Sequence, residues 1–146
     1  MSANGYAVTN MLVSVKPAGA ATAIDIECGV MGVVWNTGDT VVQWETACPD
    51  GYGAGVVKGK QNLDINYALD YDKTKTPMPF ALILDEYHGE VAKVTWTPDP
   101  NVPAYILSGD VILQRGTRTH NIGAVAASTV NLPCLGAGIL PPVATP

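Results

Sequence analysis

Residues 61–71 read QNLDINYALDY, and this stretch decides the fold class. Every second residue from 63 to 69 is apolar, and apart from Ala68 the residues on the other face are polar: Leu63, Ile65, Tyr67 and Leu69 fall on one face, and Asn62, Asp64, Asn66 and Asp70 fall on the other. A period of two is that of a β-strand with one face on a core and the other in water. The stretch therefore predicts a strand in an antiparallel sheet, where one-sided burial is common.

Further strands are expected on both sides of this one. Short stretches rich in β-branched and aromatic residues are bounded by turn-forming residues, which is the pattern of strands. They cover residues 11–16, 21–29, 40–47, 90–98, 105–116 and 125–133. The sequence therefore predicts a mainly β fold, a two-sheet antiparallel β-sandwich or barrel.

One stretch has a helical period instead. Phe80, Ile83, Leu84 and Tyr87 follow the spacing i, i+3, i+4, i+7, which places them on one face of a helix. Thr76 is expected to cap this helix, and Gly89 is expected to end it in a left-handed conformation. We expect one short flanking α-helix at about residues 77–88.

Length and composition favour one domain with loose ends. The chain has 146 residues, of which 47% are hydrophobic and 14% are charged. We expect a domain over residues 1–138 with an N-terminal arm at 1–10, followed by a Pro-rich tail at 139–146. The net charge of −5 disfavours tight binding to nucleic acid, because such affinity comes mostly from Lys and Arg on phosphates. Neither a membrane span nor a signal peptide is expected.

The glycine-rich stretch DGYGAGVVKGK, residues 50–60, resembles a phosphate-binding loop at first sight. A Walker A loop needs a glycine at position 54 and Ser or Thr after Lys60, but the chain has Ala54 and Gln61 there. Both nucleotide-loop types also lead into a helix, whereas a strand is expected here. The stretch is therefore predicted to be the tip and descending arm of a long β-hairpin.

No set of residues predicts catalysis or a bound cofactor. His88 and His120 lack partners at metal-ligand spacing, and the three cysteines form no CxxC pair. We therefore expect no enzyme, no cofactor and no metal, with one disulfide such as Cys28–Cys48 left open. Core packing is expected for most of the tryptophans; the alternative is a carbohydrate-binding module with exposed flat rings. These residues are Trp35, Trp44 and Trp96.

Three stretches carry a resemblance to a known family. VQWETACPDGYGAGVVKGKQNLDINYALDY (42–71) has a strand ending in Trp and an acidic residue, then a loop, then a long alternating strand. TPMPFALILDEYHGEVAKVTWTPDP (76–100) has a short helix closed by Gly and followed by a strand. SGDVILQRGTRTHNIGAVAASTVNLPCLG (108–136) has a closing pair of strands. In these features the chain resembles the major tail tube proteins of long, non-contractile-tailed phages.

The resemblance implies a structural virion protein. Members of that family form six-copy rings in which sheets of neighbouring subunits join, and the rings stack into a tube that conducts DNA without binding it specifically. It further implies a location in the virion tail, assembly in the bacterial host cytoplasm, and tape measure, tail tip and tail terminator proteins as partners. The alternative is a capsid decoration protein or another virion β-domain.

Two sets of residues are candidates for roles in such a tube. The glycine-rich loop is expected to contact a neighbouring subunit through Asp50, Gly51, Tyr52 and Gly53, with Tyr52 as the anchoring side chain. Acidic residues on alternating positions are expected to face the lumen and repel DNA. These are Asp25, Glu27, Asp64 and Asp110.

Overall fold

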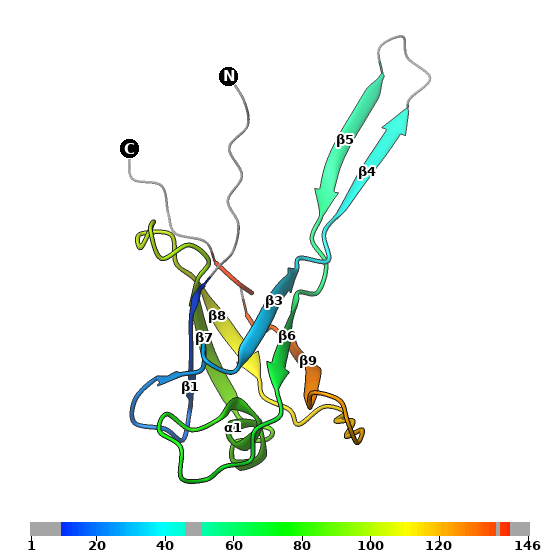
Figure 1. Cartoon of the computed structure of the whole chain (residues 1–146). Helices are drawn as coiled ribbons and strands as arrows, with labels where there is room; N and C mark the ends of the chain where they lie inside the picture. The colour runs from blue at the N-terminus through cyan, green and yellow to red at the C-terminus, as the bar shows by residue number, and fades with distance from the viewer. Residues whose placement is uncertain (1–9, 46–50, 137, 141–146) are drawn as a thin grey trace.

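The computed structural model of the chain describes residues 10–45, 51–136 and 138–140. These residues form antiparallel strands and one short helix, so the prediction of a mainly β fold is confirmed (Figure 1). The elements are β1 (Leu12–Pro17), β2 (Ile24–Asp25), β3 (Val30–Asn36), β4 (Thr40–Glu45), β5 (Tyr52–Val57), β6 (Asn62–Ala68), α1 (Phe80–Glu86), β7 (Val91–Thr97), β8 (Leu107–Ile112) and β9 (Ala127–Pro133).

Two sheets share one core. Their strand orders are β2-β1-β7-β8 and β3-β6-β9, and each neighbouring pair is antiparallel. The apolar face of the 61–71 stretch is buried as predicted, and it belongs to the same core as the inward residues of the other sheet. The central members of this core are Leu63, Ile65, Tyr67, Val15, Val94, Val111, Val130 and Leu132.

The chain that follows β9 joins the two sheets along one side. Cys134 forms an antiparallel bridge with Val111 of β8, and Leu140 forms another with Ser108. Ile139 is buried in the core. Ile139 and Leu140, expected in the Pro-rich tail, are thus part of the fold, whereas 141–146 and the arm at 1–9 lie outside the described residues. Within the described residues the sheets do not close into a barrel.

Helix α1 closes the lower end of the sandwich in Figure 1. Its residues Phe80, Ile83 and Leu84 are buried as predicted, and the Phe80 ring meets that of Tyr67 edge-on at 5.1 Å. The helix is shorter than expected because Pro79 occupies the N-cap position, and no side chain caps the helix. The predicted Thr76 cap is therefore wrong.

Gly89 has φ of +86°, so the predicted left-handed conformation after the helix is confirmed. Its N–H donates to the carbonyl of Leu113 at 2.7 Å, and the N–H of Leu113 donates to the carbonyl of Glu90 at 3.0 Å. The glycine therefore turns the chain from the helix into β7 beside the end of β8.

The region before β4 differs from expectation. The predicted strand at 21–29 is reduced to the two residues of β2, because the chain turns at residues 27–29. The strand β3 was not predicted, since its alternation is broken: the register with β6 shifts between Val30 and Gly32, and Met31 is exposed. The shift is a β-bulge, which side-chain periodicity does not reveal.

Candidate assembly surfaces

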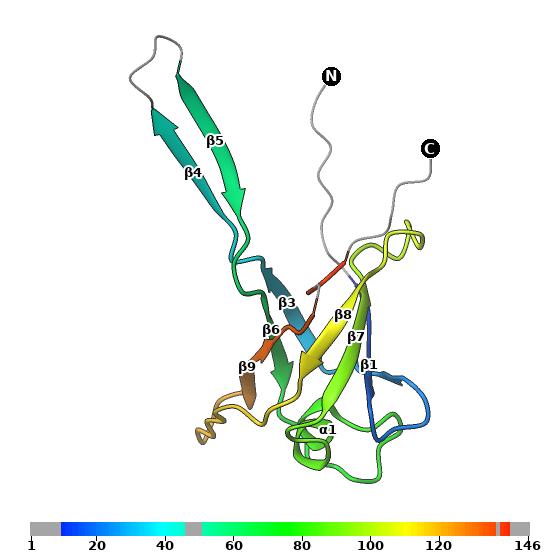
Figure 2. The ribbon, with the colours of Figure 1, turned by 180° about the vertical axis from the view of Figure 1, so that it is seen from behind.

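Strands β4 and β5 form a ribbon that stands away from the sandwich. They pair only with each other among the described strands, and they continue the β3–β6 hairpin beyond the end of its sheet (Figures 1 and 2). The predicted long hairpin is thus present, and the residues after Gly51 form its strand β5. Its tip at 46–50 lies outside the described residues.

The ribbon exposes apolar side chains on both faces. The register places Val41 opposite Val56 on one face, and Trp44 with Val42 and Val57 on the other. All five are exposed, with Val41 at 66% and Trp44 at 52%. An isolated two-stranded hairpin is at best marginally stable in water. The ribbon is therefore an apolar protrusion that no other described strand covers.

The glycines of the ribbon lie beneath Trp44. Trp44 pairs with Gly53 across the ribbon, and a Cβ atom added at Gly53 would overlap the indole ring. Gly55 lies under the other end of the same ring, at ordinary contact distance. The indole thus packs flat on bare backbone with one face and presents its other face to solvent.

The structure describes Gly51, the Tyr52 backbone and Gly53 of the predicted contact set, and of these Gly53 lies against the indole. Gly53 is directly under Trp44, Tyr52 begins β5 opposite Glu45, and Gly51 is half-buried beside it. Asp50 lies outside the described residues. Trp44 was not among the predicted contact residues, because tryptophan in an alternating stretch favours the core.

The ribbon meets the sandwich at a close backbone crossing. Gly38, with φ of +67°, approaches the carbonyl of Lys60, and Gly59 approaches the carbonyl of Gly38 so closely that neither position has room for a Cβ atom. The Gly59 N–H donates to the Asp39 carboxylate at 3.3 Å. This crossing, residues 37–39 with 58–60, is called the pivot below.

The four acidic residues predicted for a lumen do not share one face. Asp64 lies on the outer face of β3-β6-β9, and Asp25 and Asp110 lie on exposed positions of the other sheet, in β2 and β8. Glu27 lies in the turn after β2, and its Oε2 atom is buried without a hydrogen-bond partner. Because the two sheets pack against each other, Asp64 points to the opposite side from Asp25 and Asp110.

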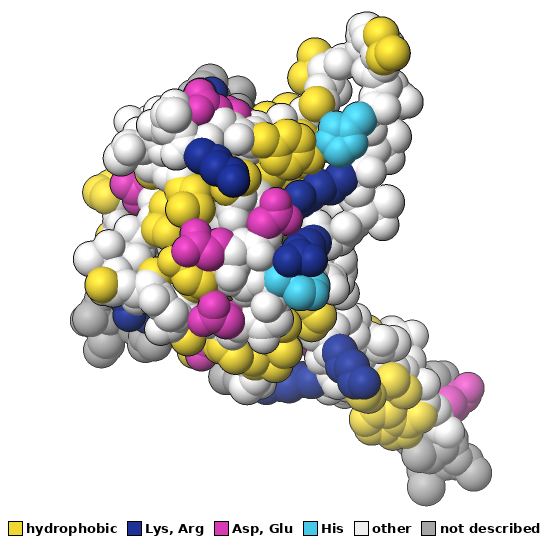
Figure 3. All heavy atoms as spheres, turned by 90° about the horizontal axis from the view of Figure 1, so that it is seen from below, with side chains coloured by type: hydrophobic (Ala, Val, Ile, Leu, Met, Phe, Trp, Pro, Cys, Tyr) yellow, Lys and Arg dark blue, Asp and Glu magenta, His cyan; other side chains and the backbone are white. Residues whose placement is uncertain are grey.

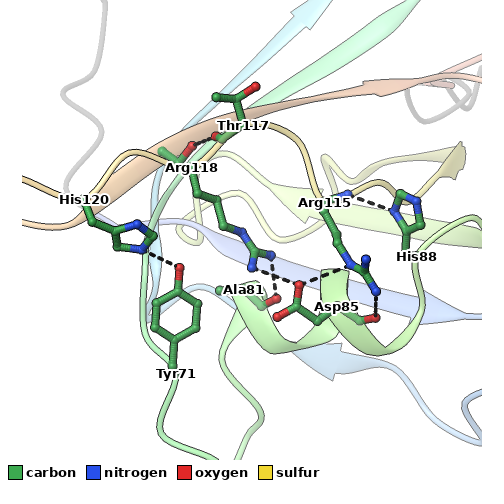
Figure 4. Close-up of polar contacts among 9 residues, drawn as sticks. Tyr71, Ala81, Asp85, His88, Arg115, Thr117, Arg118 and His120 are labelled. Carbon is green, nitrogen blue, oxygen red and sulfur yellow. Dashed lines mark hydrogen bonds and ion pairs between the residues drawn. The ribbon is translucent and has the colours of Figure 1, made fainter.

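The connection from β8 to β9, residues 114–126, is fastened to helix α1 and is called the strap (Figure 4). Arg118 forms an ion pair with the Asp85 carboxylate at 2.9 Å and donates to the Ala81 carbonyl at 2.9 Å. Arg115 pairs with the same carboxylate at 3.5 Å. The two arginines therefore hold the strap along the helix, Arg118 at its first turn and Arg115 at the Asp85 carbonyl near its C-terminal end.

The environment of Arg118 favours its charged form. Burial opposes the charge, but the Tyr67 hydroxyl and the Asp85 carboxylate outweigh it and hold the pKa of Arg118 above its ordinary value. The cation also lies 5.8 Å from the ring centroid of Tyr71. The strap is thus fixed to the body by a permanently charged group.

Each of the two histidines makes one polar contact within the fold. His88 Nδ1 accepts a hydrogen bond from the Arg115 backbone N–H at 3.1 Å, and His120 Nε2 lies 2.8 Å from the Tyr71 hydroxyl. Figure 3 shows this end of the molecule from below, where acidic, basic and histidine side chains are interspersed with apolar ones. The tip of the strap is apolar, with Ile122 and Val125 fully or almost fully exposed.

Other features that could carry chemistry are sparse in the described part of the chain. No group of three or more His, Cys, Asp or Glu residues there could hold a metal ion. Cys28 and Cys134 are free thiols, burial raises the pKa of Cys134, and Cys48 lies outside the described residues. None of the described helices has the length and hydropathy to cross a bilayer.

The tryptophans have three different environments. Trp96 is buried and Trp35 is half-buried, with its indole N–H donating to Gln61 Oε1 at 3.1 Å. The expected core packing is therefore right for Trp96, partly right for Trp35 and wrong for Trp44. One exposed ring does not make the set of flat faces that the carbohydrate-binding alternative requires.

Comparison with known proteins finds a likeness of fold. Neither a protein family model nor a curated protein sequence matches the chain. A solved structure does: a chain in the cryo-EM structure of the anti-feeding prophage (AFP) baseplate, 6-fold symmetrised, superposes with a TM-score of 0.60 at 15% sequence identity. The match covers 96% of this chain and 97% of that chain, so the two share a fold over nearly their whole lengths.

Proposed function

We propose that the chain is a structural subunit of a phage tail or tail-like tube. In this proposal copies of the chain form six-membered rings, and the rings stack into a conduit through which DNA leaves the particle. The exposed apolar ribbon β4–β5 is the observation that carries the proposal. A neighbouring subunit would bury its two faces.

A second copy of the chain is the partner that fits the ribbon best. Strand β3 pairs only with β6 among the described residues, so its other edge is open. Open edges invite pairing with other chains, and a closed ring of identical subunits uses such edges while limiting the number of copies. The ribbon and the β3 edge are parts of one continuous hairpin, so one neighbour can engage both.

The structural likeness to the prophage baseplate chain supports this assignment. That structure is described as 6-fold symmetrised, which is the symmetry we propose for this chain. Tape measure, tail tip and tail terminator proteins are proposed as the further partners, with the virion tail as the location and the bacterial host cytoplasm as the site of assembly. The proposed role requires no catalysis, cofactor or metal.

Within the ribbon we propose that Trp44 is the main anchor, together with Gly51, Tyr52 and Gly53, and Asp50 at the tip. Tryptophan is enriched among residues that dominate interface energies, since it buries a large rigid surface. The packing of Trp44 on Gly53 holds the indole in place before contact, which reduces the entropy lost on binding.

The test is to assemble the purified protein with and without its ribbon. In the ribbonless variant an Asn-Gly turn replaces residues 40–57 between Asp39 and Lys58, which the pivot already holds close together. We expect rings or hollow tubes from the wild type by negative-stain microscopy, and a folded monomer from the variant. A wild type that stays monomeric at high concentration with a tail initiator present would contradict the proposal. Lattice-dependent binding to capsids would instead favour a decoration protein.

A further inference from the structure

The outer faces of the two sheets differ in charge. The face of β3-β6-β9 that points away from the core has one carboxylate, that of Asp64, and no Lys or Arg on its strands. Amide and small side chains make up most of the rest. The residues on this face are Gly32, Val34, Asn36, Asn62, Asp64, Asn66, Ala68, Ala127, Thr129, Asn131 and Pro133.

The outer face of the other sheet carries exposed cations. Lys16 of β1 lies directly opposite Lys93 of β7, and Lys93 lies opposite Asp110 of β8. Lysines on an open surface bind phosphates and release counterions, which is the main source of affinity for DNA. This face also carries Asp25 and Asp110, so its two lysines and two carboxylates balance, whereas the face of β3-β6-β9 carries one negative charge and no cation that would hold a passing polyanion.

The single carboxylate of the first face is fixed in place. Asp64 accepts hydrogen bonds from the amide of Asn36 at 2.9 Å and from the amide of Asn131 at 2.7 Å. Asn36 also donates to Asn62 at 2.7 Å. The network spans all three strands, so the Asp64 carboxylate is held on the central strand of the sheet. The amides of Asn36 and Asn131 are engaged in hydrogen bonds to it.

Among the described residues, only the sheet β3-β6-β9 has a long open edge to share with another copy. The edge of β8 is occupied by the chain's own residues Cys134 and Leu140, and β2, at the opposite edge, is two residues long. By contrast β3 is seven residues long, and its free edge leads into the ribbon. A continuous wall around a channel therefore forms more readily from β3-β6-β9.

We propose that in the assembled ring the outer face of β3-β6-β9 lines the channel and that Asp64 and Asn66 face the passing DNA. This inference rests on the proposed function. The outer face of β2-β1-β7-β8, with Lys16 and Lys93, then lies on the outside of the tube. Of the acidic residues predicted for the lumen, Asp64 stays there and Asp25 and Asp110 move to the exterior. Lys58 and Lys60 lie in the pivot, beyond the ends of the channel-lining strands.

Thiol labelling tests this orientation. Asn66→Cys and Lys93→Cys each place one thiol on an exposed strand position, in a chain whose Cys28, Cys48 and Cys134 are replaced by Ser. Assembled tubes react with a small biotin-maleimide and are then incubated with streptavidin, which is too bulky to enter a tail-sized channel. We expect streptavidin along Lys93→Cys tubes and none along Asn66→Cys tubes, although both variants bind it once dissociated.

Streptavidin along Asn66→Cys tubes, or its absence from Lys93→Cys tubes, would overturn the proposed orientation. Absence of tubes from the wild-type chain would instead overturn the proposed function, and microscopy shows this before any label is added. The two failures are therefore distinguishable.

A second measurement uses DNA itself. Asn66→Lys with Thr129→Lys adds two positive charges to the proposed channel face, and Ser14→Lys with Val91→Lys adds two to the opposite face. When tubes assemble in the presence of short double-stranded DNA, the first variant should retain DNA that resists nuclease. The second should bind DNA that nuclease removes. Nuclease-resistant DNA in the second variant alone would overturn the proposal.

Discussion

The indole of Trp44 lies flat on the backbone of Gly53 in the neighbouring strand of the ribbon. This packing explains why a strand of the sequence YGAGVV contains glycines, which weaken strands by their entropy and lack of side chain. The glycine at 53 makes room for the ring, and the ring in turn covers the backbone that the glycine leaves bare.

Gly53→Val should therefore displace the indole without unfolding the sandwich. The added side chain overlaps the ring, while the ribbon pairs with no strand of either sheet. We expect an unchanged midpoint of thermal unfolding and loss of ring formation by microscopy. Ala124→Val, on an exposed position of the strap and outside the ribbon, is the control that ends in the same side chain. Normal tubes from Gly53→Val would show that Trp44 is no anchor.

The pivot should be sensitive to any side chain at Gly38. Its φ of +67° strains other residues, and an added Cβ atom would meet the Lys60 carbonyl. Gly38→Ala should cost about 1–3 kcal/mol of local conformational free energy, and hydrogen exchange should be faster in the ribbon. Gly123→Ala is the control, because Gly123 also has a positive φ but nothing within 4 Å of an added Cβ. Equal exchange rates in the two variants would mean that the crossing does not hold the ribbon.

The helix should tolerate charge on one face only. Leu84 is fully buried and Leu82 is half-buried at the helix surface. Leu84→Asp should lower the free energy of unfolding by about 4 kcal/mol or more, because it buries an unpaired carboxylate. Leu82→Asp should cost much less, and urea denaturation measures both. A stable, assembly-competent Leu84→Asp chain would contradict the described packing.

The strap should loosen when the shared carboxylate is removed. Asp85→Asn leaves Arg115 and Arg118 without their anionic partner, and Asp85 is partly exposed, so we expect a loss of about 1 kcal/mol. Limited proteolysis should cut residues 119–125 faster, and high salt should reduce the difference from the wild type. Glu86→Gln, one residue along the helix and exposed, should leave the cleavage rate unchanged. Identical cleavage in all three chains would show that the arginines do not fasten the strap.

Side-chain periodicity predicted the elements in which the spacing of apolar residues along the element itself determines which face is buried. The alternation in β6 and the apolar stripe of α1 each needed one buried face, and both occur where the sequence places them. Strand β3 escaped prediction because its bulge breaks the alternation.

The candidate sites were harder to predict because they depend on how distant strands are arranged. Alternation indicated that Asp64 and Asp110 leave the core, but it carries no information on which sheet each strand joins. Core packing was expected for most of the tryptophans, and the sequence did not single out Trp44 as the exposed one. Its exposure follows from the ribbon's departure from the sandwich, which begins at the close backbone crossing of Gly38 and Gly59. A crossing between residues 21 positions apart leaves no periodic signal in the sequence.

The ribbon extends from the sandwich at the pivot alone, so a small rotation there gives a large displacement at its far end. A strand of six residues is about 20 Å long, so a rotation of about 10° at the crossing moves the far end of the ribbon by about 3 Å. The sandwich itself need not deform, because the ribbon pairs with no strand of either sheet. In the proposed tube, subunits with identical bodies would therefore reach partners at slightly different distances, and a stack of rings would curve without breaking its contacts.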